Sequence, residues 1–162
     1  MAGDAEKRAI RAFDQVPLRR PGGARIVGYG TILAASRIAE AVFARAGHPP
    51  PPERLAWLEC ELEDFLARSG PRSRWVLTIM VHLVSRLGPL FIGRCVGLGA
   101  LPVPERIRAL RRLEERFGEP LLAVKALLCL LYYEHPDAAR EVGFDGNCLV
   151  PHEQPNRLEV LR

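Results

Sequence analysis

The hydrophobic positions of this chain recur at helical spacing, and prolines and glycines divide them into segments of helix length. Apolar residues three and four positions apart lie on one face of an α-helix. The segments that predict helices are residues 4–14, 29–46, 52–69, 72–87, 104–117, 121–133 and 136–141. No segment shows the alternation typical of a half-buried strand. We therefore predict an all-α fold, an irregular bundle of six or seven helices.

The connections between these segments carry their own signals. Gly47 is expected to end the helix 29–46, and His48 followed by four prolines predicts a stiff, extended connector. Residues 88–102 are apolar but rich in glycine, which predicts a packed loop or a broken helix. Beyond Gly143 the composition shifts to Asn, Pro, His and Gln without periodicity. We expect one helical domain over residues 1–146 and an extended C-terminal tail over 147–162.

Two of the predicted helices are apolar over most of their circumference. In the segment 72–87 the polar residues form one narrow stripe, consisting of Arg74, Thr78, His82, Ser85 and Arg86. The segment 121–133 is apolar at every position except Lys125. As a helix it is about 20 Å long, which is short of the bilayer core of about 30 Å. It is therefore the best candidate for the central helix of the core.

The stretch 75–101 has more apolar surface than a domain of this size can easily bury. A large exposed apolar patch usually marks an interface, so we expect another molecule to cover it. Aromatic residues contribute a disproportionate share of binding energy. We therefore choose five aromatic residues as candidate interface residues, two from this stretch and three from later in the chain: Trp75, Phe91, Tyr132, Tyr133 and Phe144. The alternative for each of the five is a place in the core of the domain.

The charge of the chain favours no particular class of partner strongly. Its 23 basic and 19 acidic side chains give a net charge of +4, a small excess that prefers anionic surfaces without requiring nucleic acid. The arginines of the segment 104–117 alternate with glutamates, and no aromatic residue is placed there to stack on a base. A solvated helix with salt bridges is the better interpretation, and no nucleic-acid partner is expected.

The chain lacks the motifs of common enzymes and cofactor sites. There is no H-E-x-x-H, no G-x-S-x-G and no P-loop. Gly93, Gly97 and Gly99 have the wrong spacing for the dinucleotide fingerprint, and no βαβ context surrounds them. We therefore predict no catalytic residue and no cofactor held by this chain itself.

The cysteines and histidines give no clear metal site. Four cysteines, Cys60, Cys95, Cys129 and Cys148, are spread singly along the chain, which argues against a zinc ribbon. A reducing compartment is the simpler interpretation, and two disulfides are the alternative. Cys129, inside an apolar run, is expected to be a buried thiol. His135, Cys148 and His152 fall within eighteen residues, but turn and surface histidines are the simpler interpretation. We predict no metal.

The N-terminus carries no signal for secretion. It is polar and mixed in charge, and the pair Arg19-Arg20 is followed directly by Pro21-Gly22-Gly23 rather than by an apolar stretch. Export by the twin-arginine route is therefore not expected. A cytoplasmic or membrane-peripheral location is the prediction.

The C-terminal half carries a more specific pattern. Within residues 91–148 the run Lys125-Ala-Leu-Leu-Cys-Leu-Leu-Tyr-Tyr is followed, ten residues after Tyr133, by Gly143-Phe-Asp-Gly. A leucine- and proline-containing hinge at 98–104 and an arginine-rich helix at 105–116 precede it. This pattern resembles the helical segment before the flavin domain of long-form GMC (glucose-methanol-choline) oxidoreductases, including the long-chain alcohol oxidase type. It also resembles the small subunits of gluconate 2-dehydrogenase, the subunit 3-like proteins.

The resemblance implies a non-catalytic accessory subunit. Such a subunit would bind and stabilise a FAD-dependent GMC-type oxidoreductase chain that acts on alcohols, sugars or sterols. The partner chain would hold the FAD and the catalytic histidine. The alternative is a peripheral membrane-surface protein without an oxidoreductase partner, in which residues 75–101 lie in the bilayer interface and arginines contact anionic lipid.

Overall fold

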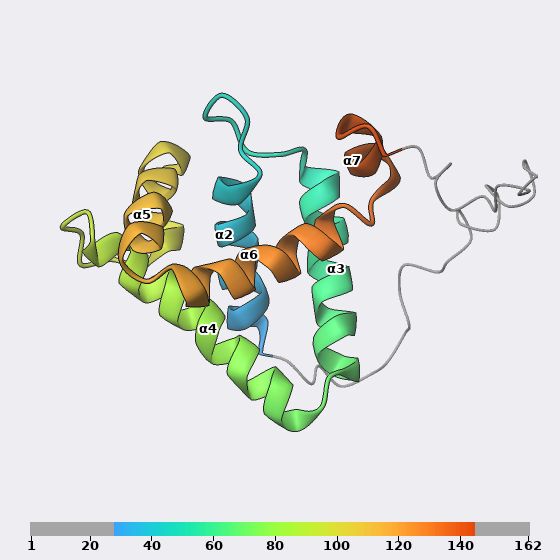
Figure 1. Ribbon diagram of the computed structural model, residues 1–162, viewed down its shortest axis with the longest axis horizontal. Coiled ribbons are helices and arrows are strands. Elements are labelled where there is room, and N and C mark those ends of the chain that lie inside the picture. Colours follow the sequence, from blue (N-terminus) through green and yellow to red (C-terminus); the bar gives the residue numbers. More distant parts are fainter. Residues whose placement is uncertain (1–27, 145–162) are drawn as a thin grey trace, which may run out of the picture.

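The computed structural model describes residues 28–144, and these residues form six α-helices and one short 3-10 turn without any strand (Figure 1). The elements are α2 (Tyr29–Val42), α3 (Pro52–Arg68), α4 (Pro71–Leu90), η1 (Leu98–Ala100), α5 (Val103–Arg116), α6 (Gly118–Tyr132) and α7 (Pro136–Glu141). The predicted all-α bundle is confirmed. The helix predicted at 4–14 and the tail at 147–162 lie outside the described residues.

Several helix ends follow directly from local sequence. Proline occupies the first turn of α3, α4, α5 and α7, where its missing N–H removes no helical hydrogen bond. In α3 and α5 a glutamate lies in the first turn and an arginine in the last, which complements the helix dipole. These charges and prolines explain why the bounds of α3, α5 and α7 agree with those predicted within about a residue.

Helix α2 lies at the centre of the bundle and contacts α3, α4, α5, α6 and η1. Ala35, Ile38 and Ala39 are completely buried. Their small or compact side chains let several neighbouring helices approach the α2 backbone.

The prediction that the segment 121–133 forms the central helix is wrong. That segment belongs to α6, which crosses the outside of the bundle in front of α2 (Figure 1). One face of α6 packs inward through Leu121, Val124 and Leu128. The other face is exposed, although it is also apolar. An apolar circumference therefore does not by itself indicate that a helix is covered on all sides.

Helix α4 turns part of its polar stripe toward the bundle. The guanidinium of Arg74 donates to the carbonyl oxygens of Leu66, Ala67 and Ser69 at 2.9, 3.3 and 3.1 Å, and so caps the C-terminal end of α3. His82 Nε2 lies 3.2 Å from Thr31 Oγ1 on α2. These polar contacts tie α4 to α3 and α2, and they leave much of its apolar surface on the outside.

Two helices have C-terminal ends that differ from the predicted ones by more than one residue. Helix α2 ends at Val42, and Gly47 lies beyond it in a tight turn closed by the paired backbones of Arg45 and His48. Ala46 and Gly47 both have positive φ, 51° and 81°, which a helix cannot continue. Helix α4 runs on to Leu90 through Gly88 and Pro89, because both residues are buried against the rest of the bundle.

A buried ion pair joins α2 to α5. Arg106 is 7% exposed, and its guanidinium pairs with the Glu40 carboxylate. The same guanidinium donates to Leu101 O at 2.6 Å and to Gly99 O at 3.1 Å. Glu40 also accepts from Arg37 at 2.5 Å. The sequence assigned Arg106 to a solvated face, and that assignment is wrong: the arginine holds η1 and its C-terminal connection against α2.

Ion pairs also anchor the last described helix. Glu141 of α7 accepts from Arg54 of α3 at 2.6 Å and pairs with Arg45 at 2.9 Å. The hydrogen bond from Arg54 holds the pKa of the Glu141 carboxyl below its usual value. The hydrogen bond to Glu141, followed by one to Tyr132, raises the pKa of Arg54.

We expect the Glu141 contacts to stabilise the fold only while this carboxyl is ionised. Because its folded pKa is lowered, the contribution is complete above the unfolded value near 4.5 and is lost as the pH falls through the folded pKa. Glu141→Gln should therefore lower the midpoint of thermal unfolding at neutral pH, and the difference from the wild type should shrink in acid. Melting curves at a series of pH values between neutral and strongly acidic measure this. A difference that stays constant across the series would contradict it.

Candidate functional site

The structure places the five predicted interface residues in different environments. Trp75 is 68% exposed and Phe144 is 48% exposed. Phe91 and Tyr133 are half-buried and pack against the core. Tyr132 is only 5% exposed. Trp75 and Phe144 are thus accessible to another molecule, and Tyr132 is not.

Tyr132 is a core residue. Its ring stacks on Phe43 with the centroids 3.9 Å apart and the planes 9° from parallel. Tyr133 meets both rings edge-on, at 6.0 and 5.4 Å. This aromatic cluster joins the end of α6 to the segment that follows α2. Placing Tyr132 among the interface residues is corrected accordingly: the residue closes the bundle.

The outward side of α4 presents large apolar side chains to solvent. We call this surface the α4 stripe; it consists of Trp75, Val76, Ile79, Leu83 and Leu90, which are between 39% and 68% exposed. The gaps between successive residues are one, three, four and seven positions, which keeps all five on one side of the helix. The apolar excess predicted for residues 75–101 is therefore present at the surface over α4.

Helix α6 carries a second exposed apolar surface, the α6 stripe, formed by Leu122, Ala123, Ala126 and Leu130. Leu122 is 65% and Leu130 60% exposed. The charged Lys125 lies beside the stripe, and its ammonium group donates to Glu114 of α5 at 2.7 Å. Sequence reasoning missed this surface. The signal was there, since a helix that is apolar all round has a second apolar face to cover.

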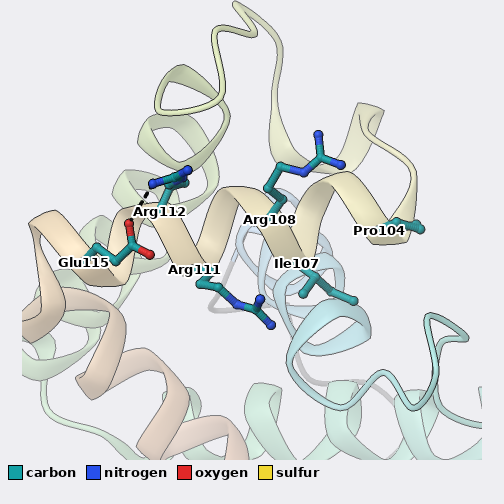
Figure 2. A pocket seen from close by; sticks show the side chains of 6 residues that line it. All are labelled: Pro104, Ile107, Arg108, Arg111, Arg112 and Glu115. Atoms are coloured by element: carbon teal, nitrogen blue, oxygen red, sulfur yellow. Dashed lines mark hydrogen bonds and ion pairs between the residues drawn. The ribbon is translucent and has the colours of Figure 1, made fainter.

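A shallow depression of about 410 Å³ lies along α5 (Figure 2). Pro104, Ile107 and the side chains of Arg108, Arg111, Arg112 and Glu115 line it. Arg112 is paired with Glu115 at 3.1 Å. Figure 2 shows Arg108 and Arg111 pointing to different sides of the helix. Arg108 and Arg111 therefore do not converge on one anion, and Arg112 forms an exposed salt bridge of the kind predicted for this helix.

Histidines, cysteines and carboxylates within residues 28–144 were candidate metal ligands. No group of three or more His, Cys, Asp or Glu residues in that range is arranged to hold a metal ion. His135 Nδ1 accepts the backbone N–H of Asp137 at 3.3 Å and so caps α7. The ligand set considered with Cys148 and His152 lies partly outside the described residues. Burial raises the pKa of the half-buried Cys129 thiol, which makes it a poor nucleophile.

None of the described helices combines the length and the hydropathy needed to cross a bilayer. Comparison of the chain with protein-family models, with curated proteins and with solved structures gave no match.

Proposed function

We propose that this chain is a non-catalytic accessory subunit that binds a larger protein through the α6 stripe. The partner we propose is a FAD-dependent oxidoreductase of the GMC type, which would hold the flavin and carry out the chemistry. The observation that carries the proposal is the exposure of Leu122 and Leu130 on a helix that already packs its opposite face into the core.

The α6 stripe has the chemistry of a protein interface. Two leucines more than half exposed lie two turns apart, and the alanines between them leave room for a partner side chain. Lys125 is already paired with Glu114, so docking an apolar partner here would not leave that ammonium group without a counter-charge. Desolvation is then mainly apolar, which favours stable rather than transient association.

The choice of partner follows from the resemblance of residues 91–148 to the helical parts of GMC-type enzymes. The specific run, residues 125–133, lies almost entirely within α6. The segment that resembles those enzymes most closely therefore includes half of the exposed stripe, at Ala126 and Leu130.

The test is co-expression of the full chain with a GMC-type flavoprotein. We expect an affinity tag on this chain to retain a yellow complex with flavin absorbance, at a fixed stoichiometry in size-exclusion chromatography. The double variant Leu122→Glu/Leu130→Glu should weaken the complex about a hundredfold or more, because two carboxylates would be buried without partners.

Leu90→Glu is the matched control, because Leu90 is also an exposed leucine, 51% exposed, but lies on α4. It should leave the complex intact. Circular dichroism of each variant alone verifies that the helices are retained. The proposal fails if the flavoprotein does not co-purify with the wild-type chain, or if the control weakens the complex as much as the α6 variant does.

A further inference from the structure

The region around α4 has an unusual distribution of charge. Between Asp64 and Glu105 the chain contains no acidic residue, whereas it contains five arginines. Three of these arginines have partners: Arg68 pairs with Asp64, Arg94 pairs with Glu105 at 3.3 Å, and Arg74 caps α3. The remaining two are Arg72 and Arg86.

Arg72 and Arg86 are exposed, and neither forms an ion pair within residues 28–144. Their positions place them on the same side of the helix as the α4 stripe. Arg72 is seven residues, or two turns, before Ile79, and Arg86 lies three residues after Leu83. The outward side of α4 is thus an apolar surface that runs from Trp75 to Leu90, with Arg72 just before Trp75 and Arg86 between Leu83 and Leu90.

We propose that the α4 stripe, together with Arg72 and Arg86, binds the surface of an anionic lipid bilayer. Trp75, Ile79 and Leu83 would enter the boundary between headgroups and acyl chains, with the helix lying parallel to the membrane plane. The aliphatic parts of the two arginines would lie along this boundary, and their guanidinium groups would reach lipid phosphates. This contact uses α4 and does not depend on partner binding through α6.

The shape of this region favours a bilayer over an acidic protein. In Figure 1 the first turns of α4, where it joins α3, extend below α2 and α6. Trp75 lies in these turns and is the most exposed of the large hydrophobic residues described. A projecting helix with tryptophan near its tip can enter a deformable lipid surface, whereas a protein would have to provide a matching groove. Tryptophan is also the residue that prefers the interface of a membrane.

The experiment is flotation of the full chain with two kinds of vesicle, pure phosphatidylcholine and an equimolar mixture with phosphatidylglycerol. We expect binding to the anionic vesicles, reduced by salt, and little binding to the neutral ones. Arg72→Gln/Arg86→Gln should weaken binding about thirtyfold, since each arginine near an anionic surface contributes about fivefold. Trp75→Ala should weaken it about tenfold through loss of apolar burial.

Arg108→Gln/Arg111→Gln is the matched control, because it removes the same charge from exposed arginines of α5. It should lower binding by less than about threefold, the effect of net charge alone. As a second readout, Trp57→Phe leaves Trp75 as the only tryptophan. The fluorescence of that variant should shift to the blue and be quenched by brominated lipid when anionic vesicles are added.

Four results would overturn the proposal. They are no flotation of the folded wild-type chain, equal binding to neutral and anionic vesicles, an equal loss in the α5 control, and no blue shift from Trp75. Binding to polyglutamate through the same residues, in the absence of vesicle binding, would assign the surface to an acidic protein instead. None of these results bears on the flavoprotein complex, which is tested through α6.

Discussion

Replacing Glu40 by alanine is expected to lower the free energy of unfolding by about 3–5 kcal/mol, because it leaves the buried guanidinium of Arg106 without its counter-charge. Arg106 would keep its hydrogen bonds to the carbonyls of Leu101 and Gly99. Those neutral acceptors do not replace a carboxylate in stabilising a desolvated cation. The loss should therefore be near the upper end of what single substitutions cause.

Urea denaturation followed by circular dichroism measures this loss. Glu115→Ala is the control: it breaks the ion pair between Arg112 and Glu115, in which both side chains are more than half exposed. The control should cost less than about 1 kcal/mol. The double variant Glu40→Ala/Arg106→Met should recover part of the loss, since the unpaired charge is removed with its partner. If Glu40→Ala costs no more than the control, the buried pair does not stabilise the fold.

Tyr132→Ala is expected to destabilise the protein by about 3–5 kcal/mol, the range for removing a buried aromatic side chain. The ring of Tyr132 stacks on Phe43 and meets Tyr133 edge-on, so its loss opens a cavity where α6 meets the end of α2. Its hydrogen bond with Arg54, which also anchors Glu141, would be lost as well.

Urea denaturation also distinguishes aromatic side chains in the core from those at the surface. Trp75→Ala removes a larger side chain, but Trp75 is 68% exposed, and its loss should change the unfolding free energy by less than about 1 kcal/mol. Vesicle binding should depend on Trp75 and not on Tyr132. Trp75→Ala should weaken binding, and the milder variant Tyr132→Phe should leave it unchanged. A Tyr132→Ala protein as stable as Trp75→Ala would contradict the placement of Tyr132 in the core.

Residue type alone gives the wrong burial for Arg106, which is buried, and for Leu122 and Leu130, which are exposed. Arg106 belongs to a helix with arginines at 106, 108, 111, 112 and 116, and the pattern of α5 fits a solvated face. It is buried because Glu40, sixty-six residues earlier, meets it from α2. Leu122 and Leu130 are exposed because the bundle covers only one side of α6. Both outcomes depend on which helices become neighbours, and no local window of sequence contains that information.

The local pattern of residues was enough to predict that the described chain is helical and where several of its helices begin and end. Prolines in the first turn, terminal charges and apolar spacing act within a few residues, so α3, α5 and α7 could be located before any packing was known. Three features depend instead on how the helices pack: the alanine-rich α2 lies at the centre, α6 lies outside, and α4 turns Arg74 and His82 toward the bundle. The physical reason is that α2, α4 and α6 each have more than one apolar side, so any of them could occupy the centre of the bundle. Small side chains allow the closest approach of neighbouring backbones. The helix with the smallest side chains therefore lies in the middle, and the apolar sides of α4 and α6 remain at the surface.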